Sequence, residues 1–395
     1  MLTLVGCGPA RPSAASRSAA VFAAIESQDA AGLRQLLAQG TDVTGRDQRG
    51  RTPLMAAARK GNPELIQALL AAGTELDDAT PDGRTALILA ARGGSVAAVK
   101  ALVRAGASLE KADQVGRTPL LYALEPQEHA RVRRARPSRA LPPNAVAIKV
   151  LLAAGANPRA RTASGRTPLS FAAQARQPAL VQWLVRAGAP VDQTDRDGWT
   201  PLMVATRSGQ LPVLRAVLRA GADPNHVSRL GWTALHEACA GDRLDLLRAL
   251  LAARADVNLR TWSGGTSLIQ AARRGHLAIV DALLAAGAHL EDASLGVTAL
   301  WVAVAGGHEA VAVRLLRAGA NANVRSPHGV TPLMLAAGRG EASLARLLLG
   351  AGAHPGDTDT LGRTAASIAA SRGHADLGRS LAAAPAPRAA QVSQP

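Results

Sequence analysis

A short signature, Gly-x-Thr followed by Pro, Ala or Ser, recurs along the 395-residue chain and constrains its fold more than any other feature. Successive threonines lie 33 residues apart, except for one interval of 49 and one of 32. A fixed period of this length indicates a tandem array of small structural units rather than two or three separate globular domains. The threonines of the signature are Thr52, Thr85, Thr118, Thr167, Thr200, Thr233, Thr266, Thr298, Thr331 and Thr364.

Each unit is predicted to hold two helices. The threonine is a good N-cap, and the proline that often follows it suits the first helical position, where no backbone N–H is needed. A second helix is indicated by apolar residues at helical spacing, such as Ile66, Leu69 and Leu70, which a neighbouring unit must cover. A glycine such as Gly73 then ends that helix in a left-handed conformation, and an Asp-x-x-Gly turn leads to the next threonine. We therefore expect an all-α repeat solenoid.

The composition agrees with layered helices and offers no catalytic centre. Aromatic residues make up 2% of the chain, so its core must be built from small and aliphatic side chains. The two cysteines allow no disulfide framework and no Cys-x-x-Cys site. His236-Glu237 and His308-Glu309 each lack the second histidine of a zinc-protease helix. We expect a protein that is not an enzyme and uses no cofactor or metal, with Cys239 as a buried core thiol.

The repeated unit resembles that of the ankyrin family. The segments Gly231-Trp232-Thr233-Ala234-Leu235-His236 and Gly221-Ala222-Asp223-Pro224-Asn225 are close to the family pattern. The resemblance covers roughly residues 16 to 384, with about ten anchored repeats. It implies stacked helix-turn-helix layers with hairpin fingers and a concave face that binds partners.

Within that resemblance we divide the chain into a remnant signal or tether, a capping repeat, the ankyrin array and a disordered tail. The array contains a 16-residue Arg-rich insertion within residues 125–144. The four parts span residues 1–15, 16–46, 47–384 and 385–395.

Two departures from the family pattern lead to structural expectations. Arg254 stands where the other units have the glycine that ends the second helix, so we expect a strained or reshaped cap there. The family histidine that ties neighbouring units survives only at His236. The other units are therefore expected to depend more on apolar contacts at this position.

The residue before each capping threonine suggests a contact surface near the fingers. Four arginines occupy this position in the first half of the array, and Trp199 and Trp232 follow. Trp262, at a finger tip, and Trp301, on a first helix, are less expected from the family consensus, whereas Trp183 is interpreted as core packing. Arg and aromatic side chains are common anchors of protein interfaces. The predicted partner-binding residues are Trp199, Trp232, Trp262, Trp301, Arg51, Arg84, Arg117 and Arg166.

Two classes of function remain open at this stage. The first is a scaffold that binds an unidentified protein on its concave face, as a monomer and without nucleic acid. The second is a polyanion or anionic-membrane binder, suggested by a formal net charge of +16 and by the arginines of the insertion. A tolerated surface insertion in an arginine-biased chain would look the same, and we favour that interpretation. The insertion arginines are Arg131, Arg133, Arg134, Arg136 and Arg139.

The segment Leu4-Val5-Gly6-Cys7 resembles the lipidation signal of bacterial lipoproteins, and a small-residue stretch like a tether follows it. The six residues before Cys7 are too few for a signal peptide. We therefore hypothesise that the true start lies upstream and that Cys7 carries a lipid. The protein would then be anchored at the periplasmic face of the cell envelope, and it would otherwise be cytoplasmic.

Overall fold

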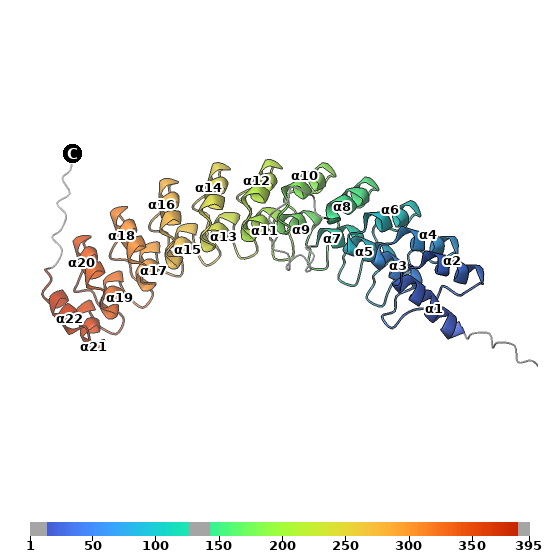
Figure 1. Ribbon diagram of the computed structural model, residues 1–395. Helices are drawn as coiled ribbons and strands as arrows, with labels where there is room; N and C mark the ends of the chain where they lie inside the picture. The colour runs from blue at the N-terminus through green and yellow to red at the C-terminus, as the bar shows by residue number, and fades with distance from the viewer. Residues whose placement is uncertain (1–13, 126–142, 386–395) are drawn as a thin grey trace, which may run out of the picture. The chain divides into compact units, whose positions relative to one another are not determined.

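The structure, a computed structural model, describes residues 14–125 and 143–385. These ranges contain 22 α-helices and no β-strand, which confirms the predicted all-α repeat architecture. The chain divides into two units, Met1–Arg196 and Asp197–Pro395, which we call unit 1 and unit 2. In each unit the helices alternate between a row of first helices and a row of second helices (Figure 1).

The helices of unit 1 are α1 (Ala14–Glu26), α2 (Ala30–Ala38), α3 (Pro53–Lys60), α4 (Pro63–Ala71), α5 (Ala86–Gly93), α6 (Val96–Arg104), α7 (Pro119–Leu124), α8 (Pro143–Ala153), α9 (Pro168–Gln174) and α10 (Pro178–Arg186). Those of unit 2 are α11 (Pro201–Ser208), α12 (Leu211–Arg219), α13 (Ala234–Ala240), α14 (Leu244–Ala252), α15 (Ser267–Arg274), α16 (Leu277–Ala285), α17 (Ala299–Ala305), α18 (Glu309–Arg317), α19 (Pro332–Arg339), α20 (Ala342–Gly350), α21 (Ala365–Ser371) and α22 (Ala375–Ala382).

The signature threonines begin the first helices as predicted. At Thr52, for example, the side-chain oxygen accepts a hydrogen bond from the backbone N–H of Met55, and Pro53 occupies the first helical position. Thr298 is the exception, because its hydroxyl makes no capping bond and is buried without a partner. It follows the interval of 32 residues, so the shortened repeat is also the one that lacks this cap.

Packing between neighbouring repeats explains the composition. First helices contact first helices, as α3 contacts α5 and α15 contacts α17, while second helices form a parallel row of contacts. Alanines such as Ala57, Ala58 and Ala90 are fully buried on the first helices, where a small side chain lets two helices approach closely. The second helices bury aliphatic residues such as Leu69 and Leu102. An array of this kind buries its core without large aromatic residues.

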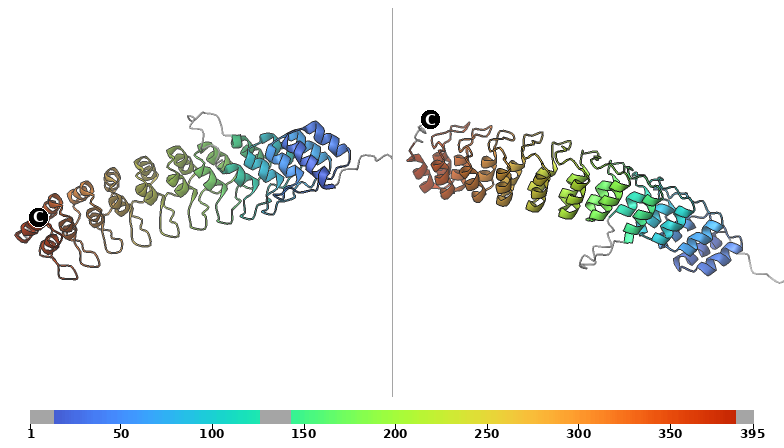
Figure 2. Two further views of the ribbon diagram at one scale, coloured as in Figure 1. Left: turned by 60° about the horizontal axis from the view of Figure 1, so that its bottom comes forward. Right: turned by 90° about the horizontal axis from the view of Figure 1, so that it is seen from above.

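Hairpin fingers join each second helix to the next first helix and project to one side of both helix rows within each unit (Figure 2). The finger aspartates stabilise the turn from inside. The carboxylate of Asp47 accepts hydrogen bonds from the backbone N–H groups of Arg49 and Arg51, both at 2.9 Å. Gly50, with a φ of 70°, closes this turn as expected for a glycine.

The predicted strain at Arg254 is present, whereas the cap itself keeps the shape of the other units. Arg254 has a φ of 64°, in the left-handed region that non-glycine residues rarely adopt. Its N–H donates to the carbonyl of Leu251 at 2.9 Å, and the N–H of Ala255 donates to Leu250 at 3.0 Å. Gly221 makes the equivalent bond to Leu218. The helix end is therefore formed normally at a conformational cost.

Replacing Arg254 by glycine is expected to raise the free energy of unfolding by about 1 kcal/mol, because glycine adopts this conformation without steric strain. The exposed Arg254 side chain makes no ion pair among the described residues, so its loss costs little. Urea denaturation of the two proteins measures the difference. An unchanged or lower stability of Arg254→Gly would contradict the strain.

Three features of the sequence fall outside the described residues. They are Cys7, all but the first residue of the predicted tail 385–395, and the insertion arginines Arg131, Arg133, Arg134, Arg136 and Arg139. No helix in the described ranges has the length and apolar character that a membrane span requires.

Candidate functional site

The four arginines predicted as a contact edge are paired with groups of unit 1 itself. Arg51 lies 2.6 Å from the Asp47 carboxylate, and Arg117 lies 2.6 Å from that of Glu125. Arg84 contacts Asp82 at 3.1 Å and donates to the Tyr122 hydroxyl at 3.1 Å. The pairs with Asp47 and Asp82 lie within a finger, whereas Tyr122 and Glu125 belong to α7 and its C-cap. A partner would have to compete with these contacts.

Arg166 and Tyr122 also make contacts within unit 1. Arg166 donates to Gln174 and lies over the ring of Phe171, 4.1 Å from its centre, and its burial lowers the pKa of its guanidinium. The Tyr122 hydroxyl donates to Asp113 at 2.7 Å. Burial and this hydrogen bond raise the pKa of Tyr122, so the phenol stays neutral at physiological pH.

Trp199 and Trp232 lie half-buried at the bases of the first two fingers of unit 2. The Arg207 guanidinium covers the Trp199 ring at 3.6 Å from its centre and also contacts the Glu237 carboxylate at 3.0 Å. Trp232 lies beside His236, with 5.8 Å between the ring centres. Both tryptophans keep part of their surface open, but each already packs against residues of its own unit.

Trp301 takes over the structural task of the missing family histidine. The buried His236 ring lies 3.2 Å from the carbonyl of Gly265, the residue before the next capping threonine. The Trp301 indole N–H donates at 2.8 Å to Val330, which holds the same position one repeat further on. The expectation that the units without the histidine depend more on apolar contacts at this position is therefore wrong for this unit, which keeps a hydrogen bond there.

Trp301→Phe is expected to lower the free energy of unfolding by about 1 kcal/mol, because it removes the indole hydrogen bond between neighbouring repeats and leaves the Val330 carbonyl with the Ser326 N–H alone, while keeping a ring in place. Trp262→Phe is the matched control. It also removes an indole hydrogen bond, to the carbonyl of Arg229, but at an exposed finger tip where water can replace it. Thermal denaturation compares the variants. Equal losses in both would contradict the structural role of Trp301.

Trp183 is half-buried and is not the core residue that the sequence suggested. The core of α10 is formed by Leu180, Val181 and Leu184. The Lys149 ammonium lies over the Trp183 ring instead, 4.1 Å from its centre. This contact joins α8 to α10, and the ring stays partly exposed to solvent.

The finger tips of unit 2 carry large apolar side chains in the open. Leu230 is 70% exposed, Trp262 is 73% exposed and Leu295 is 76% exposed, and they belong to three successive fingers. We call these three residues the tip row. The Trp262 N–H donates to the Leu230 carbonyl at 3.3 Å, and the Ser294 hydroxyl beside Leu295 donates to the Ser263 carbonyl at 2.9 Å. The three tips therefore form a continuous edge.

The tips of unit 1 differ in chemistry. The residue before the turn glycine is Arg49, Asp82, Val115 or Ser164 there, and Val115 is the one large apolar side chain among the four. In soluble proteins, large exposed apolar patches mark interaction sites, whereas single exposed apolar residues are ordinary. The contrast places the strongest candidate surface on unit 2.

Leu295 combines exposure with backbone strain. Its φ is 50° and that of Gly296 is 79°, and Ser294 and Val297 pair on either side of them. This is a two-residue turn with both φ values positive, which strongly favours Asn-Gly over Leu-Gly. A leucine here costs stability because it adopts a disfavoured conformation, and its exposed side chain gains little from burial to offset that cost.

Trp262 was among the residues predicted from the sequence, whereas Leu230 and Leu295 were not. The available signals were a leucine directly before the turn glycine, where most other fingers have polar residues, and the 32-residue interval that shortens the finger of Leu295. Neither signal concerns an aromatic or charged residue, so a search for interface anchors passed over both.

The remaining reactive groups are buried in the framework. Cys239 is fully buried, as predicted for a core thiol, and burial raises its pKa to about 12. Burial also lowers the pKa of His236 to about 4. Among the described residues no group of three or more His, Cys, Asp or Glu side chains could hold a metal ion.

Comparison with known proteins identifies the repeat. The family model described as ankyrin repeats in three copies matches residues 3–79, 21–113, 62–132, 143–228, 217–294, 268–359 and 300–388. No curated protein matches the chain. The ankyrin family typically provides non-enzymatic scaffolds for protein–protein interaction. Since the matches cover most of its length, the chain belongs to the ankyrin repeat family.

Proposed function

We propose that this protein is a non-enzymatic scaffold that binds a protein partner through the fingers of unit 2. The observation that carries the proposal is the tip row, three large apolar side chains exposed on successive fingers. Burying such side chains against a partner is favourable by about 25 cal/mol per Å² of apolar area. The tip row therefore supplies the anchors, and the concave-face prediction is refined to the finger edge.

Trp262 has the properties of an interface anchor. Its indole N–H is held by the carbonyl of Arg229, which restricts the ring before any partner arrives. A side chain that is already oriented loses less conformational entropy on binding. Trp199 and Trp232 flank the row at the finger bases and extend the proposed surface, whereas Trp301 and the paired arginines of unit 1 are assigned to the framework.

Leu295 provides the sharpest test, because stability and binding should respond in opposite directions. Leu295→Asn places the preferred residue in the Asn-Gly turn and is expected to raise the free energy of unfolding by about 1 kcal/mol. The same change removes an apolar anchor and should weaken partner binding about tenfold. Urea denaturation and calorimetric titration with the purified partner measure the two effects. A variant that is more stable and binds equally well would exclude Leu295 from the interface.

A lipid anchor at Cys7, with the scaffold held at the cell envelope, is a separate proposal supported by the Leu4–Cys7 pattern. Mass spectrometry of the peptide that contains Cys7, from the protein purified from its natural host, tests it. A diacylglyceryl modification on Cys7 is the expected result. An unmodified Cys7 in the protein from that host would contradict it.

A further inference from the structure

Several second helices of unit 2 carry arginines that form no ion pair with a carboxylate among the described residues. A groove of about 480 Å³ runs between α12 and α14. Its lining includes Leu211, Leu218 and Ala249 as apolar surface, together with three arginines, Arg215, Arg219 and Arg248. All three arginines are exposed.

The three guanidinium groups are not neutralised by the protein. Arg215 and Arg219 lie one turn apart on α12, and Arg248 holds the register of Arg215 one repeat further on. None of the three forms an ion pair with a carboxylate within the described residues. Asp245 is the one acidic residue of the lining, and Arg243 already contacts it at 3.6 Å.

The neighbouring groove shows that the same surface can be neutralised. Asp281 on α16 holds the register of Arg248 one repeat further on, and Arg314 on α18 contacts it at 2.6 Å. Between α12 and α14 an arginine occupies that position instead. Like charges one helical turn apart repel each other, so this arrangement is mildly destabilising unless an anion joins it.

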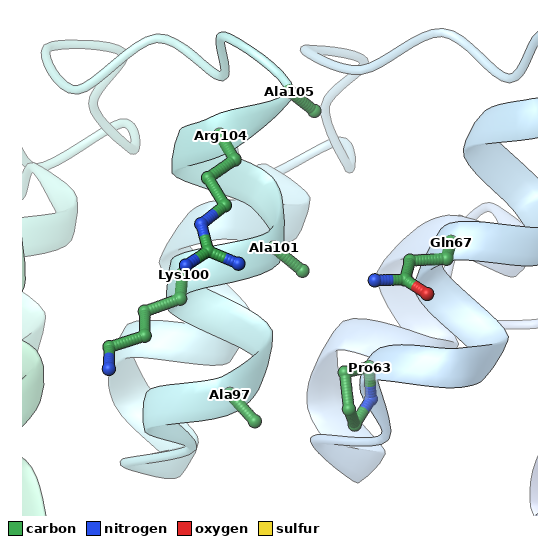
Figure 3. A pocket seen from close by; sticks show the side chains of 7 residues that line it. All are labelled: Pro63, Gln67, Ala97, Lys100, Ala101, Arg104 and Ala105. Carbon is green, nitrogen blue, oxygen red and sulfur yellow. The ribbon is translucent and has the colours of Figure 1, made fainter.

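Unit 1 contains a groove of similar construction. Lys100 and Arg104 lie along α6, and Gln67 reaches toward them from α4, as Figure 3 shows. Ala97 and Ala101 form its apolar surface, and no carboxylate is among the residues that line its volume of about 520 Å³. Each unit therefore has a groove in which two cationic side chains lie one helical turn apart beside alanines.

We propose that the groove between α12 and α14 binds a phosphate group, with Arg215, Arg219 and Arg248 as its donors. Guanidinium groups suit this ligand because each offers parallel N–H donors that match two phosphate oxygens. The phosphate can belong to a lipid headgroup or to a soluble ion. The site is separate from the tip row and does not depend on the proposed protein partner.

Binding is measured with two probes at low ionic strength. The first is inorganic phosphate, followed by calorimetric titration, and the second is vesicles of phosphatidylglycerol and phosphatidylcholine, followed by co-sedimentation. Binding of phosphate alone assigns the site to a soluble ion. Binding of vesicles that contain phosphatidylglycerol, but not of pure phosphatidylcholine vesicles, assigns it to a headgroup. Failure of both probes overturns the proposal.

Two variants of the full chain separate a site from general attraction to a basic protein. Arg215→Gln combined with Arg248→Gln is expected to weaken the observed binding at least tenfold. Arg314→Gln removes a cation that is also on a second helix but is already paired with Asp281, and it should change binding less than twofold. Equal losses per removed charge in the two proteins would overturn the proposal. Unchanged melting temperatures establish that both variants are folded.

Discussion

Acidification from pH 6.5 to pH 4 is expected to lower the free energy of unfolding by about 3 kcal/mol through His236 alone. The pKa of this side chain is lowered from 6.5 to about 4 by burial. The ring is fully enclosed, with Nδ1 accepting from the Thr233 N–H and Nε2 facing the Gly265 carbonyl. Protonation would place an N–H against the Thr233 N–H, so the folded protein binds the proton poorly.

The sign follows from the two protonation states. The unfolded chain takes up the proton near pH 6.5, whereas the folded chain takes it up near pH 4. The stabilisation by neutral His236 is therefore complete above pH 6.5 and is lost as the pH falls toward 4, at about 1.4 kcal/mol per pH unit.

Urea denaturation followed by tryptophan fluorescence measures this loss, and four of the five tryptophans lie in unit 2. His236→Gln is the control. It is less stable at neutral pH, because the bonds of the ring are altered, but its stability should fall less steeply between pH 6.5 and 4. Parallel pH dependences of the two proteins would show that His236 does not titrate in this range.

The combined change Leu230→Ala and Trp262→Ala is expected to weaken partner binding about a hundredfold. Truncating a central aromatic anchor commonly costs 2 kcal/mol or more, and an adjacent apolar side chain adds to this loss. Both residues are at least 70% exposed in the free protein, so the variant should keep its stability within about 0.5 kcal/mol. Calorimetric titration and thermal denaturation measure the two quantities.

Leu361→Ala is the matched control for this prediction. Leu361 is also a finger-tip leucine and is 73% exposed, but the finger of Pro327 and His328 separates it from the tip row. Its truncation should weaken binding less than threefold. An equal effect of Leu361→Ala and Leu230→Ala would indicate general surface hydrophobicity rather than a local anchor.

Much of the fold could be predicted because each repeat is specified by local chemistry. The capping bond of Thr52, the left-handed φ at Gly73 and the strained φ at Arg254 all follow from positions within one repeat. The burial of Cys239 follows in the same way from the alanine position that it occupies. Repetition made these inferences secure, since the same signal could be read many times along the chain.

The candidate site was harder to predict because it depends on side-chain partners. Arg51 and Arg117 look free in the sequence, but their carboxylate partners lie four and eight residues away, in a finger and at the C-cap of a first helix. Trp301 is tied to Val330, 29 residues away, by a bond that only the stacking of repeats creates. Arg215 and Arg248, by contrast, can be recognised as a candidate site only when the structure shows which arginines of the second helices form ion pairs.

Cross-linking from the tip row tests the central claim, a protein partner on the fingers of unit 2, most directly. A photoreactive amino acid replaces Ser263, which adjoins Trp262 in the same tip, so Leu230, Trp262 and Leu295 stay intact. A second protein carries it in place of Arg317, an exposed residue of the second helix α18. The account predicts a discrete protein adduct from position 263 and none from position 317. An adduct from position 317 with none from position 263 would contradict it.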